Sequence, residues 1–310
     1  MTSAVVCAYH DVGVRCLSVL LAHGIDVRLV LTHQDSSREL IWFDSVATLA
    51  AQHDLPVITP ADPNTPEVIG RLRAAQPDFL FSFYYRSMLG PEILEIPGHA
   101  ALNMHGSLLP KYRGRVPINW AIIHGERETG ATLHHMTVKP DAGPIVDSEA
   151  VPILPNDVAL DVFRKVVCAS EICLHRALPR LIDGTARATP QDLAAGSYFG
   201  GRTAADGVID WNQPARRIHD LVRAVAPPYP GASTRIEGET LLILRTLPVP
   251  ANPAPFARPT LFARDGRVYA QAGDGALLRI LQASQHGLDL PMQALAERLA
   301  TRPLPLQMRR

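Results

Sequence analysis

A chain of 310 residues, 47% hydrophobic and 19% charged, is long enough for two domains and has the composition of a soluble globular protein. Lys plus Arg and Asp plus Glu are balanced at 30 each, and this zero net charge argues against a nucleic acid as partner. The N-terminus has no signal-peptide pattern, and no apolar run is long enough to span a bilayer. We therefore expect a cytoplasmic protein without membrane insertion.

The cysteines carry no signature of a metal site. Cys7, Cys16, Cys168 and Cys173 lack C-x-x-C spacing and mostly lie in apolar runs. We expect buried thiols in a reducing compartment and no bound metal.

Short apolar runs alternate with helical patterns over the first 105 residues. Strands are expected at residues 4–8, 27–31, 56–58, 78–82 and 100–105, and helices at 14–23, 44–53, 66–75 and 91–94. This alternation predicts an α/β fold with a parallel sheet covered by helices on both faces. The first turn contains Gly13 alone, without G-x-G-x-x-G, which disfavours a nicotinamide dehydrogenase. Ligands of such sheets bind at the carboxyl ends of the strands, where we expect His10, Tyr84 and His105.

The stretch 101–115, ALNMHGSLLPKYRGR, is typical of a strand that runs into an irregular loop. Side chains two apart on a strand point to the same face, so Asn103 and His105 project together while Met104 packs behind them. An amide donor beside an imidazole can hold a carbonyl oxygen and handle a proton, as acyl transfer requires. The same pair is also common at strand ends without any catalytic role, so the spacing alone leaves both interpretations open.

A hairpin is expected after a helix at residues 117–124. Residues 130–138 and 144–152 alternate as two strands joined by the turn KPDAG. Aspartate is frequent in such turns for structural reasons, so a functional role for Asp141 requires the hairpin to fold back until its carboxylate reaches His105.

The remaining chain predicts a long helix followed by a small β domain. Helices are expected at residues 158–182, 216–225 and 292–300, and short β-like runs with turn signals lie between residues 232 and 282. These runs indicate a barrel-like domain, and we expect the tail at residues 301–310 to fray.

The run HGSLLPKYRG, followed by ETG at residues 128–130 and DAG at residues 141–143, resembles the signature of folate-dependent formyltransferases. These enzymes move a formyl group from 10-formyltetrahydrofolate to an amine. The resemblance implies a Rossmann-like catalytic domain over residues 1–197 and a smaller OB-like β-barrel domain over residues 198–310. The strings FSFYYR and FGGRT further resemble the branch that formylates UDP-4-amino-4-deoxy-L-arabinose, a step of lipid A modification in polymyxin resistance.

The resemblance also implies roles for individual residues. Asn103 would steady the developing oxyanion, His105 would act as acid or base, and Asp141 would raise the pKa of the imidazole. The implied folate contacts are Ser87, Met88, Leu89, Arg115, Thr137, Val138, Lys139, Pro140 and Asp141. Arg113 and Arg202 would bind the anionic groups of a nucleotide-linked amino sugar, although folate carboxylates suit Arg113 equally.

Other interpretations remain open from the sequence. Methionyl-tRNA formyltransferases share the signature but usually carry a basic, Gly-rich loop after the second strand, where this chain has HQDSSRELIWFDS at residues 33–45. Where the arabinose branch has two adjacent arginines, this chain has Gly201 and Arg202. This difference leaves the identity of the acceptor open, and a dTDP-linked amino sugar is a further candidate. A non-catalytic folate or nucleotide-sugar sensor is disfavoured because binding alone does not require Asn103, His105 and Asp141 together. The sequence determines neither the oligomeric state nor the enzyme that supplies the amine.

Overall fold

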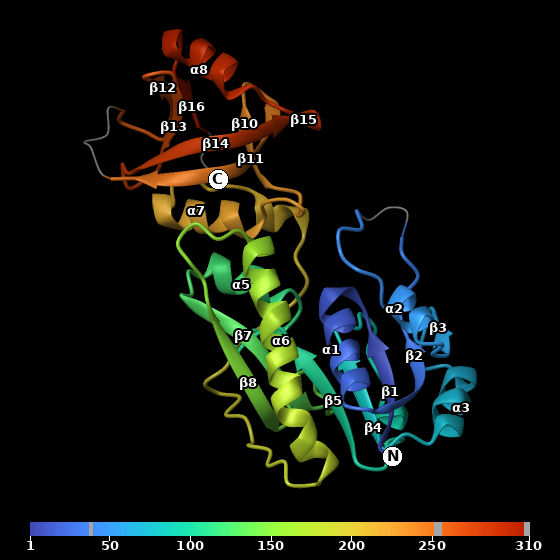
Figure 1. The fold of residues 1–310 in the computed structure, drawn as a ribbon. Coiled ribbons are helices and arrows are strands. Elements are labelled where there is room, and N and C mark those ends of the chain that lie inside the picture. The colour runs from blue at the N-terminus through green and yellow to red at the C-terminus, as the bar shows by residue number, and fades with distance from the viewer. Residues whose placement is uncertain (37–39, 251–255, 307–310) are drawn as a thin grey trace. The chain divides into compact units, whose positions relative to one another are not determined.

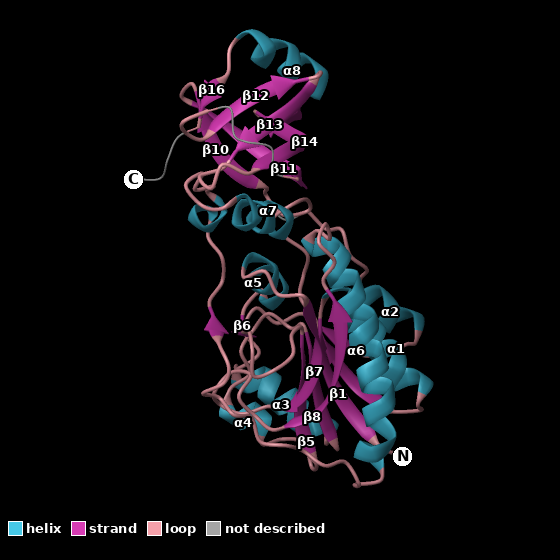
Figure 2. Ribbon diagram, turned by 90° about the vertical axis from the view of Figure 1, so that its left-hand side faces the viewer, coloured by secondary structure: helices cyan, strands magenta, loops and turns pink. Residues whose placement is uncertain are grey.

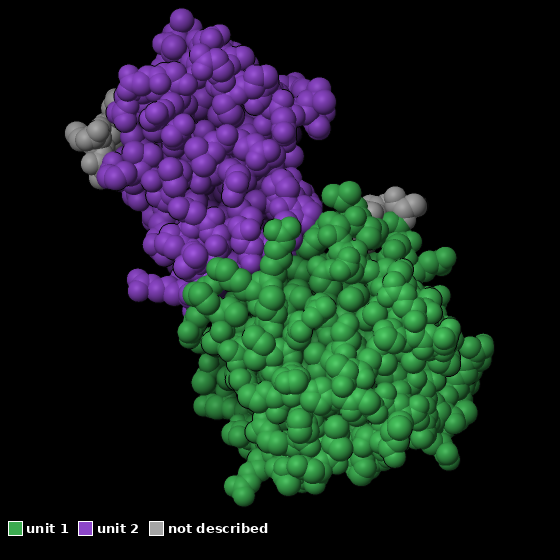
Figure 3. Space-filling model, in the orientation of Figure 1, with its two compact units in different colours: residues 1–117, 128–152, 163–200 green, residues 118–127, 153–162, 201–310 purple. Residues whose placement is uncertain are grey.

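The computed structural model describes residues 1–36, 40–250 and 256–306. The chain forms two compact units (Figure 3). The N-terminal unit comprises residues 1–117, 128–152 and 163–200, and the C-terminal unit comprises residues 118–127, 153–162 and 201–310. The sequence-based boundary between residues 197 and 198 stays a prediction.

A seven-stranded sheet forms the centre of the N-terminal unit (Figure 1). Its strands are β1 (Ser3–Ala8), β2 (Asp26–Leu31), β3 (Val57–Ile58), β4 (Phe79–Phe83), β5 (Ala100–His105), β7 (Glu128–His135) and β8 (Ile145–Pro152). The first five are parallel in the Rossmann order β3-β2-β1-β4-β5, which confirms the predicted α/β fold. The hairpin β7–β8 then extends the sheet antiparallel beyond β5.

Helices cover both faces of this sheet. They are α1 (His10–Ala22), α2 (Val46–Gln52), α3 (Pro66–Ala75), α4 (Pro91–Leu94) and α6 (Ala159–Ile182). Figure 2 shows α1 and α6 on one face and α3 and α4 on the other. Helix α1 begins at His10 instead of residue 14, so the lone Gly13 lies inside it. A Cβ at Gly13 would lie 2.9 Å from Val46 and 3.1 Å from Ala8, so the glycine allows close packing of α1 on β1 and α2.

Three of the four cysteines are buried as expected, and the prediction was wrong for Cys168, which is exposed. Helix α6 turns Val166, Ala169 and Cys173 toward the core, and its period of 3.6 residues puts Cys168 on the solvent side. All four thiols are free.

In the described parts of the chain, no helix combines the length and apolar character needed to cross a bilayer.

Two very short strands form a separate parallel pair in the N-terminal unit. β6 (Arg113–Gly114) pairs with β9 (Tyr198–Phe199) through bonds from Arg113 N to Ser197 O (3.0 Å) and from Arg115 N to Phe199 O (2.9 Å). Gly114 has a φ of 96°, and a Cβ there would lie 2.1 Å from the Phe199 carbonyl oxygen. The pairing therefore requires glycine at this position.

The C-terminal unit is built on a curled antiparallel sheet. Its strands are β10 (Ala232–Ile236), β11 (Glu239–Val249), β12 (Thr260–Arg264), β13 (Arg267–Gln271), β14 (Leu277–Gln285), β15 (Leu288–Asp289) and β16 (Leu304–Pro305). The order is β10-β11-β14-β13-β12-β16, with β15 beside β14, so in the described residues the sheet is an open half-barrel. Leu304 pairs with Leu261, which corrects the expectation that the whole tail frays; residues 307–310 lie outside the described residues.

Helices and one large aromatic residue close the core of this unit. α7 (Ala215–Ala224) packs on β11, α8 (Met292–Thr301) packs on β12 and β13, and α5 (Pro117–Ile123) and a 3-10 turn at Ala204–Gly207 complete it. Trp211 is fully buried and donates from its indole nitrogen to Thr234 Oγ1 at 2.8 Å.

The segment at residues 33–45, which was compared with the loop of the tRNA enzymes, is described only in part, because residues 37–39 lie outside the described residues.

We predict that Gly114→Ala lowers the free energy of unfolding more than Gly24→Ala does. Both glycines have positive φ, 96° and 70°, but a Cβ at Gly24 meets nothing within 4 Å. Gly24→Ala should cost about 1–2 kcal/mol for the backbone strain, and the clash should add about 1–3 kcal/mol at Gly114. Urea titrations of both variants provide the measurement, and equal losses would show that β9 yields to the new side chain.

Candidate active site

The site begins at the carboxyl end of β5, where alternation places two polar side chains on one face. Asn103 and His105 lie two residues apart, and Met104 between them is 1% exposed. His105 is itself 6% exposed, although it is polar. A buried imidazole requires polar partners, and the structure provides them from the loop that follows.

The backbone of β6 and of Tyr112, the residue before it, holds His105 and Asp141. His105 Nε2 lies 2.8 Å from the Tyr112 carbonyl oxygen, to which it donates. Gly114 N donates to Asp141 Oδ2 at 2.8 Å. Peptide groups alternate in direction along a strand, so these two groups face the site while Arg113 N and Arg115 N face β9. The two-residue strand and the residue before it thus fix the imidazole and the carboxylate together.

Three nitrogen atoms surround the other oxygen of Asp141. Asn103 Nδ2, His105 Nδ1 and His134 Nε2 each lie 3.5 Å from Asp141 Oδ1. The β7–β8 hairpin therefore does fold back onto β5, as a functional role for Asp141 requires. At 3.5 Å the contacts are longer than ordinary hydrogen bonds, so a donor can exchange this contact for a closer bond to a substrate oxygen.

Asp141 is held as a carboxylate by its surroundings. Its side chain is 14% exposed, and burial alone would raise its pKa. The charge of His105, the neighbouring His134 ring and the Gly114 N–H outweigh burial and lower the pKa of Asp141 well below its ordinary value. The site therefore combines a permanent negative charge with an adjacent imidazole.

His134 belongs to the site although its sequence context predicts no such role. It lies opposite Asn103 in the antiparallel register of β5 and β7. Its Nδ1 donates to the His135 carbonyl oxygen at 2.8 Å, so in the neutral ring Nε2 accepts from Asn103 Nδ2 at 3.1 Å. His134 thereby fixes which end of the Asn103 amide faces Asp141. Only the strand register gives this pairing, and no local motif indicates it.

Gln191 likewise has no sequence context that predicts a role, and it holds the turn that carries Asp141. Its Nε2 donates to the carbonyl oxygens of Asp141 (3.0 Å) and Gly143 (2.6 Å). Asp141 has a φ of 52°, and a Cβ at Gly143 would lie 1.9 Å from the His135 carbonyl oxygen. The two hydrogen bonds from Gln191 and the close approach at Gly143 therefore fix the conformation of the turn.

The predicted folate contacts lie in two loops and on one exposed arginine. Ser87, Met88 and Leu89 follow β4; Met88 is 59% exposed, whereas Leu89 is 6% exposed and packs in the core. The stretch from Thr137 to Pro140 leads into Asp141 and is mostly exposed, with Val138 at 69%. Thr137 Oγ1 donates to Lys139 O at 2.8 Å, and the Arg115 side chain is exposed. Of these predicted folate contacts, Asp141 is the one whose side chain contacts Asn103 and His105.

The two predicted sugar-binding arginines belong to different units. Arg113 is 7% exposed and lies in β6. Arg202 belongs to the C-terminal unit, where it donates to the Asp206 carbonyl oxygen at 3.1 Å. Its guanidinium lies over the Trp120 ring at 5.8 Å, and burial lowers the pKa of Arg202.

Tyr84 and His10 lie at the same sheet edge as His105, as expected from the strand order. The rings of His10 and Tyr84 are 6.5 Å apart, and both residues have positive φ, 68° and 56°. A Cβ at Gly106 would lie 2.0 Å from the Tyr84 hydroxyl oxygen. Glycine after His105 therefore allows the tyrosine to reach the start of the loop.

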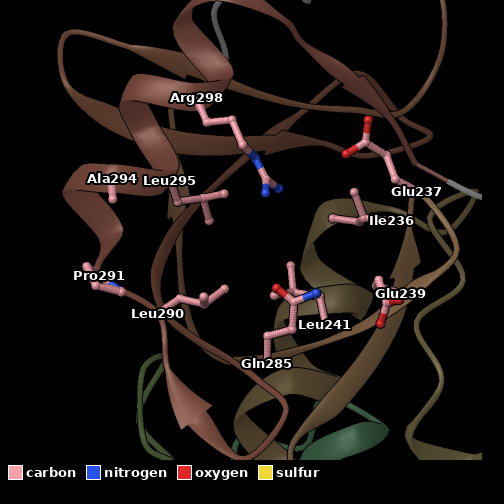
Figure 4. Close-up of a pocket in the computed structure, with 10 residues that line it drawn as sticks. All are labelled: Ile236, Glu237, Glu239, Leu241, Gln285, Leu290, Pro291, Ala294, Leu295 and Arg298. Carbon is pink, nitrogen blue, oxygen red and sulfur yellow. The ribbon is translucent and has the colours of Figure 1, made fainter.

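Two further observations concern possible ligands elsewhere. In the described residues, no group of three or more His, Cys, Asp or Glu side chains is arranged to hold a metal ion. A cavity of about 280 Å³ lies within the C-terminal unit, between α8 and β10, β11 and β14 (Figure 4). Its lining combines apolar residues with Glu237, Glu239 and Arg298 and includes none of the predicted site residues.

Comparison with protein families gives two matches. The formyl transferase model matches residues 17–178, and the model of the formyl transferase C-terminal domain matches residues 202–296. The chain belongs to the formyl transferase family. The signature loop, Asn103, His105 and Asp141 all lie within the first match.

Solved structures share the fold of this formyl transferase. The N-formyltransferase from Helicobacter canadensis, in complex with folinic acid and dTDP-3-aminofucose, aligns with a TM-score of 0.70 at 21% identity over 90% of this chain and 99% of that chain. WlaRD, a sugar 3N-formyltransferase in the presence of dTDP and 5-N-formyl-THF, aligns with a TM-score of 0.71 at 19% identity over 93% of this chain and 99% of that chain. HypX from Aquifex aeolicus in complex with tetrahydrofolic acid gives 0.64 at 19% identity over 94% of this chain and 46% of that chain.

We predict that Asp141→Asn destabilises the formyl transferase near neutral pH and that the loss becomes smaller as the pH falls below the ordinary aspartate pKa. A carboxylate whose pKa is lowered by folding stabilises the folded state above its unfolded pKa of about 3.9, and the contribution is lost as the pH falls toward the folded value. The difference in unfolding free energy at pH 7 should be roughly 1–3 kcal/mol. Chemical denaturation from pH 7 to pH 3 measures it. Asp265→Asn is the matched control, since Asp265 is exposed and has the same φ of 52°.

We also predict that His134 acts through Asn103. His134→Leu removes the acceptor of the Asn103 amide and should lower kcat about tenfold, which corresponds to about 1.4 kcal/mol of barrier. His134→Gln keeps an acceptor oxygen and should restore part of the rate. In an Asn103→Ala background the His134→Leu change should cost little, because its target is gone. Additive losses in steady-state kinetics would mean that His134 acts independently of the amide.

Proposed function

We propose that this formyl transferase moves the formyl group of 10-formyltetrahydrofolate to the amino group of a nucleotide-linked amino sugar. The observation that supports it most directly is the meeting of Asn103, His105 and Asp141 around a single carboxylate oxygen in the formyl transferase domain. An amide, an imidazole and a carboxylate are the groups that transfer of a carbonyl carbon between two nitrogens requires.

The chemistry follows from these groups. The free amine of the acceptor attacks the formyl carbon, so a new C–N bond forms while the formyl oxygen becomes an oxyanion. Asn103 Nδ2 and a protonated His105 donate hydrogen bonds to this oxyanion, and each donor is worth about 2.7–4 kcal/mol by analogy with oxyanion holes. The bond from carbon to N10 of the folate then breaks. As this bond breaks, His105 gives its Nδ1 proton to N10 and then takes up the proton lost by the amine, directly or through water ordered by Asp141.

The folate would be held at the predicted loops. The backbone at Ser87, Met88 and Leu89 would bind the pterin, and the turn from Thr137 to Asp141 would enclose it. Arg115 is exposed and therefore suits the flexible, carboxylate-bearing tail of the folate. The similar solved structures contain folinic acid, were obtained in the presence of 5-N-formyl-THF, or contain tetrahydrofolic acid, which supports a folate as formyl donor.

A sugar nucleotide is the acceptor that the observations favour. The enzyme from Helicobacter canadensis binds dTDP-3-aminofucose, and WlaRD is a sugar 3N-formyltransferase. Within this class we infer UDP-4-amino-4-deoxy-L-arabinose, because the strings FSFYYR and HGSLLPKYRGRVPINW resemble the enzymes of that branch. Arg202, stacked over Trp120, would bind an anionic or planar part of the nucleotide. The link to lipid A and the cytoplasmic location stay predictions.

Turnover of the full chain with 10-formyltetrahydrofolate tests this proposal. UDP-4-amino-4-deoxy-L-arabinose should be formylated with the highest kcat/KM, ahead of dTDP-3-aminofucose and of methionyl-tRNA. Higher kcat/KM for dTDP-3-aminofucose would keep the class and replace the sugar. Formylation of methionyl-tRNA at a comparable rate would overturn the class, and folate binding without turnover on any amine would indicate a sensor.

His105→Ala is the matching active-site variant. It should lower kcat about a hundredfold or more, because a donor to the oxyanion and the proton carrier are both lost. Binding of folinic acid, measured by calorimetry, should stay close to wild type, since the folate loops are unchanged. A near-normal rate would remove His105 from the mechanism.

A further inference from the structure

Two arginines in the described residues are buried to more than nine tenths, and their environments differ. Arg223 is 4% exposed and is paired with Asp220 at 2.8 Å, with the carbonyl oxygens of Leu154 and Asp157 within 3.4 Å of its guanidinium. Arg113 is 7% exposed, and no carboxylate of the described residues lies within 4 Å of its guanidinium. Its Nε is buried without a hydrogen-bond partner.

An unpaired buried cation is costly to maintain. Taking a charge out of water carries a penalty of several kcal/mol unless an opposite charge and hydrogen bonds compensate. Arg223 has this compensation from within the chain. A guanidinium cannot lose its proton to avoid the penalty, so Arg113 is complete only when an anion from outside the chain binds it.

The position of Arg113 places this anion close to the reacting groups. The residue before Arg113 accepts the hydrogen bond of His105, and the residue after it donates to Asp141. An anion bound by Arg113 therefore lies no farther from β6 than the length of an arginine side chain. It belongs to a substrate of the transfer.

We propose that Arg113 binds the diphosphate of the nucleotide-linked amino sugar, an inference that rests on the proposed function. In such a sugar a single pyranose ring separates the amine from the diphosphate. In the folate a benzoyl ring, an amide and a further carbon separate N10 from the first carboxylate. The diphosphate is thus the anion nearer to the transferred carbon, and its oxygens match the two-pronged guanidinium. Arg113 then positions the acceptor amine through the far side of the sugar ring.

Calorimetric titration of UDP, inorganic pyrophosphate and folinic acid into the full chain tests the proposal. Arg113→Met keeps the apolar stem and removes the charge, and it should weaken UDP and pyrophosphate at least tenfold while folinic acid binds within twofold of wild type. Arg113→Lys keeps the charge but not the fork, so it should give an intermediate loss and also serves if the methionine variant does not fold. Arg71→Met, at an exposed arginine of α3, is the control.

Thermal unfolding provides a second measurement. Pyrophosphate should raise the Tm of wild type and of Arg71→Met but not that of Arg113→Met, and the ligand-free Tm of Arg113→Met should equal or exceed that of wild type because an unpaired charge is removed. Unchanged UDP and pyrophosphate binding in both Arg113 variants would overturn the proposal. Selective loss of folinic acid would assign Arg113 to a folate carboxylate and overturn it as well. If wild type itself neither binds UDP nor formylates a nucleotide sugar, the proposed function fails instead.

Discussion

The arrangement of the site depends on one short strand that is fixed along both edges. On one edge β6 pairs with β9, and on the other the Tyr112 carbonyl and the Gly114 N–H hold His105 and Asp141. Because peptide groups point alternately to the two sides of a strand, both functions are served by consecutive residues. The separation between imidazole and carboxylate is therefore set by backbone geometry, which side-chain rotation does not alter. Gly114 is the point at which this backbone must pass closest to its neighbour.

Electrostatics and hydrogen bonding then give the site its character. Asp141 keeps its charge in a mostly buried place because the charge of His105 and the Gly114 N–H stabilise its carboxylate. The nitrogens around Oδ1 lie at the outer limit of bonding distance, whereas the bonds to the β6 backbone are short. Tight backbone bonds fix the groups in place, and the looser contacts leave them able to bind a substrate oxygen. His134 orients the Asn103 amide, and Gln191 holds the turn that carries Asp141.

Much of the fold could be predicted from the sequence, and the site only in part. The period of two along β5 is enough to place Asn103 and His105 on one face, and the alternation of strands and helices predicts the parallel sheet. The partnership of Asn103 with His134 depends on the antiparallel register of β5 and β7, which local patterns do not contain. Gln191 reaches Asp141 from 50 residues away, through a loop without a regular pattern. Contacts between distant segments of this kind are determined by tertiary packing, and a single sequence does not reveal them.

The limits of the formyl transferase match have a consequence for the architecture of the domain. The match ends at residue 178, whereas Gln191 and strand β9, which brace the catalytic loop, come later in the chain. It also begins after β1, the central strand of the parallel sheet. A fragment cut to the matched residues would contain all three catalytic candidates yet lack the elements that hold them in register. Any recombination that joins this domain to a new partner must therefore take place beyond Phe199 if the chemistry is to survive.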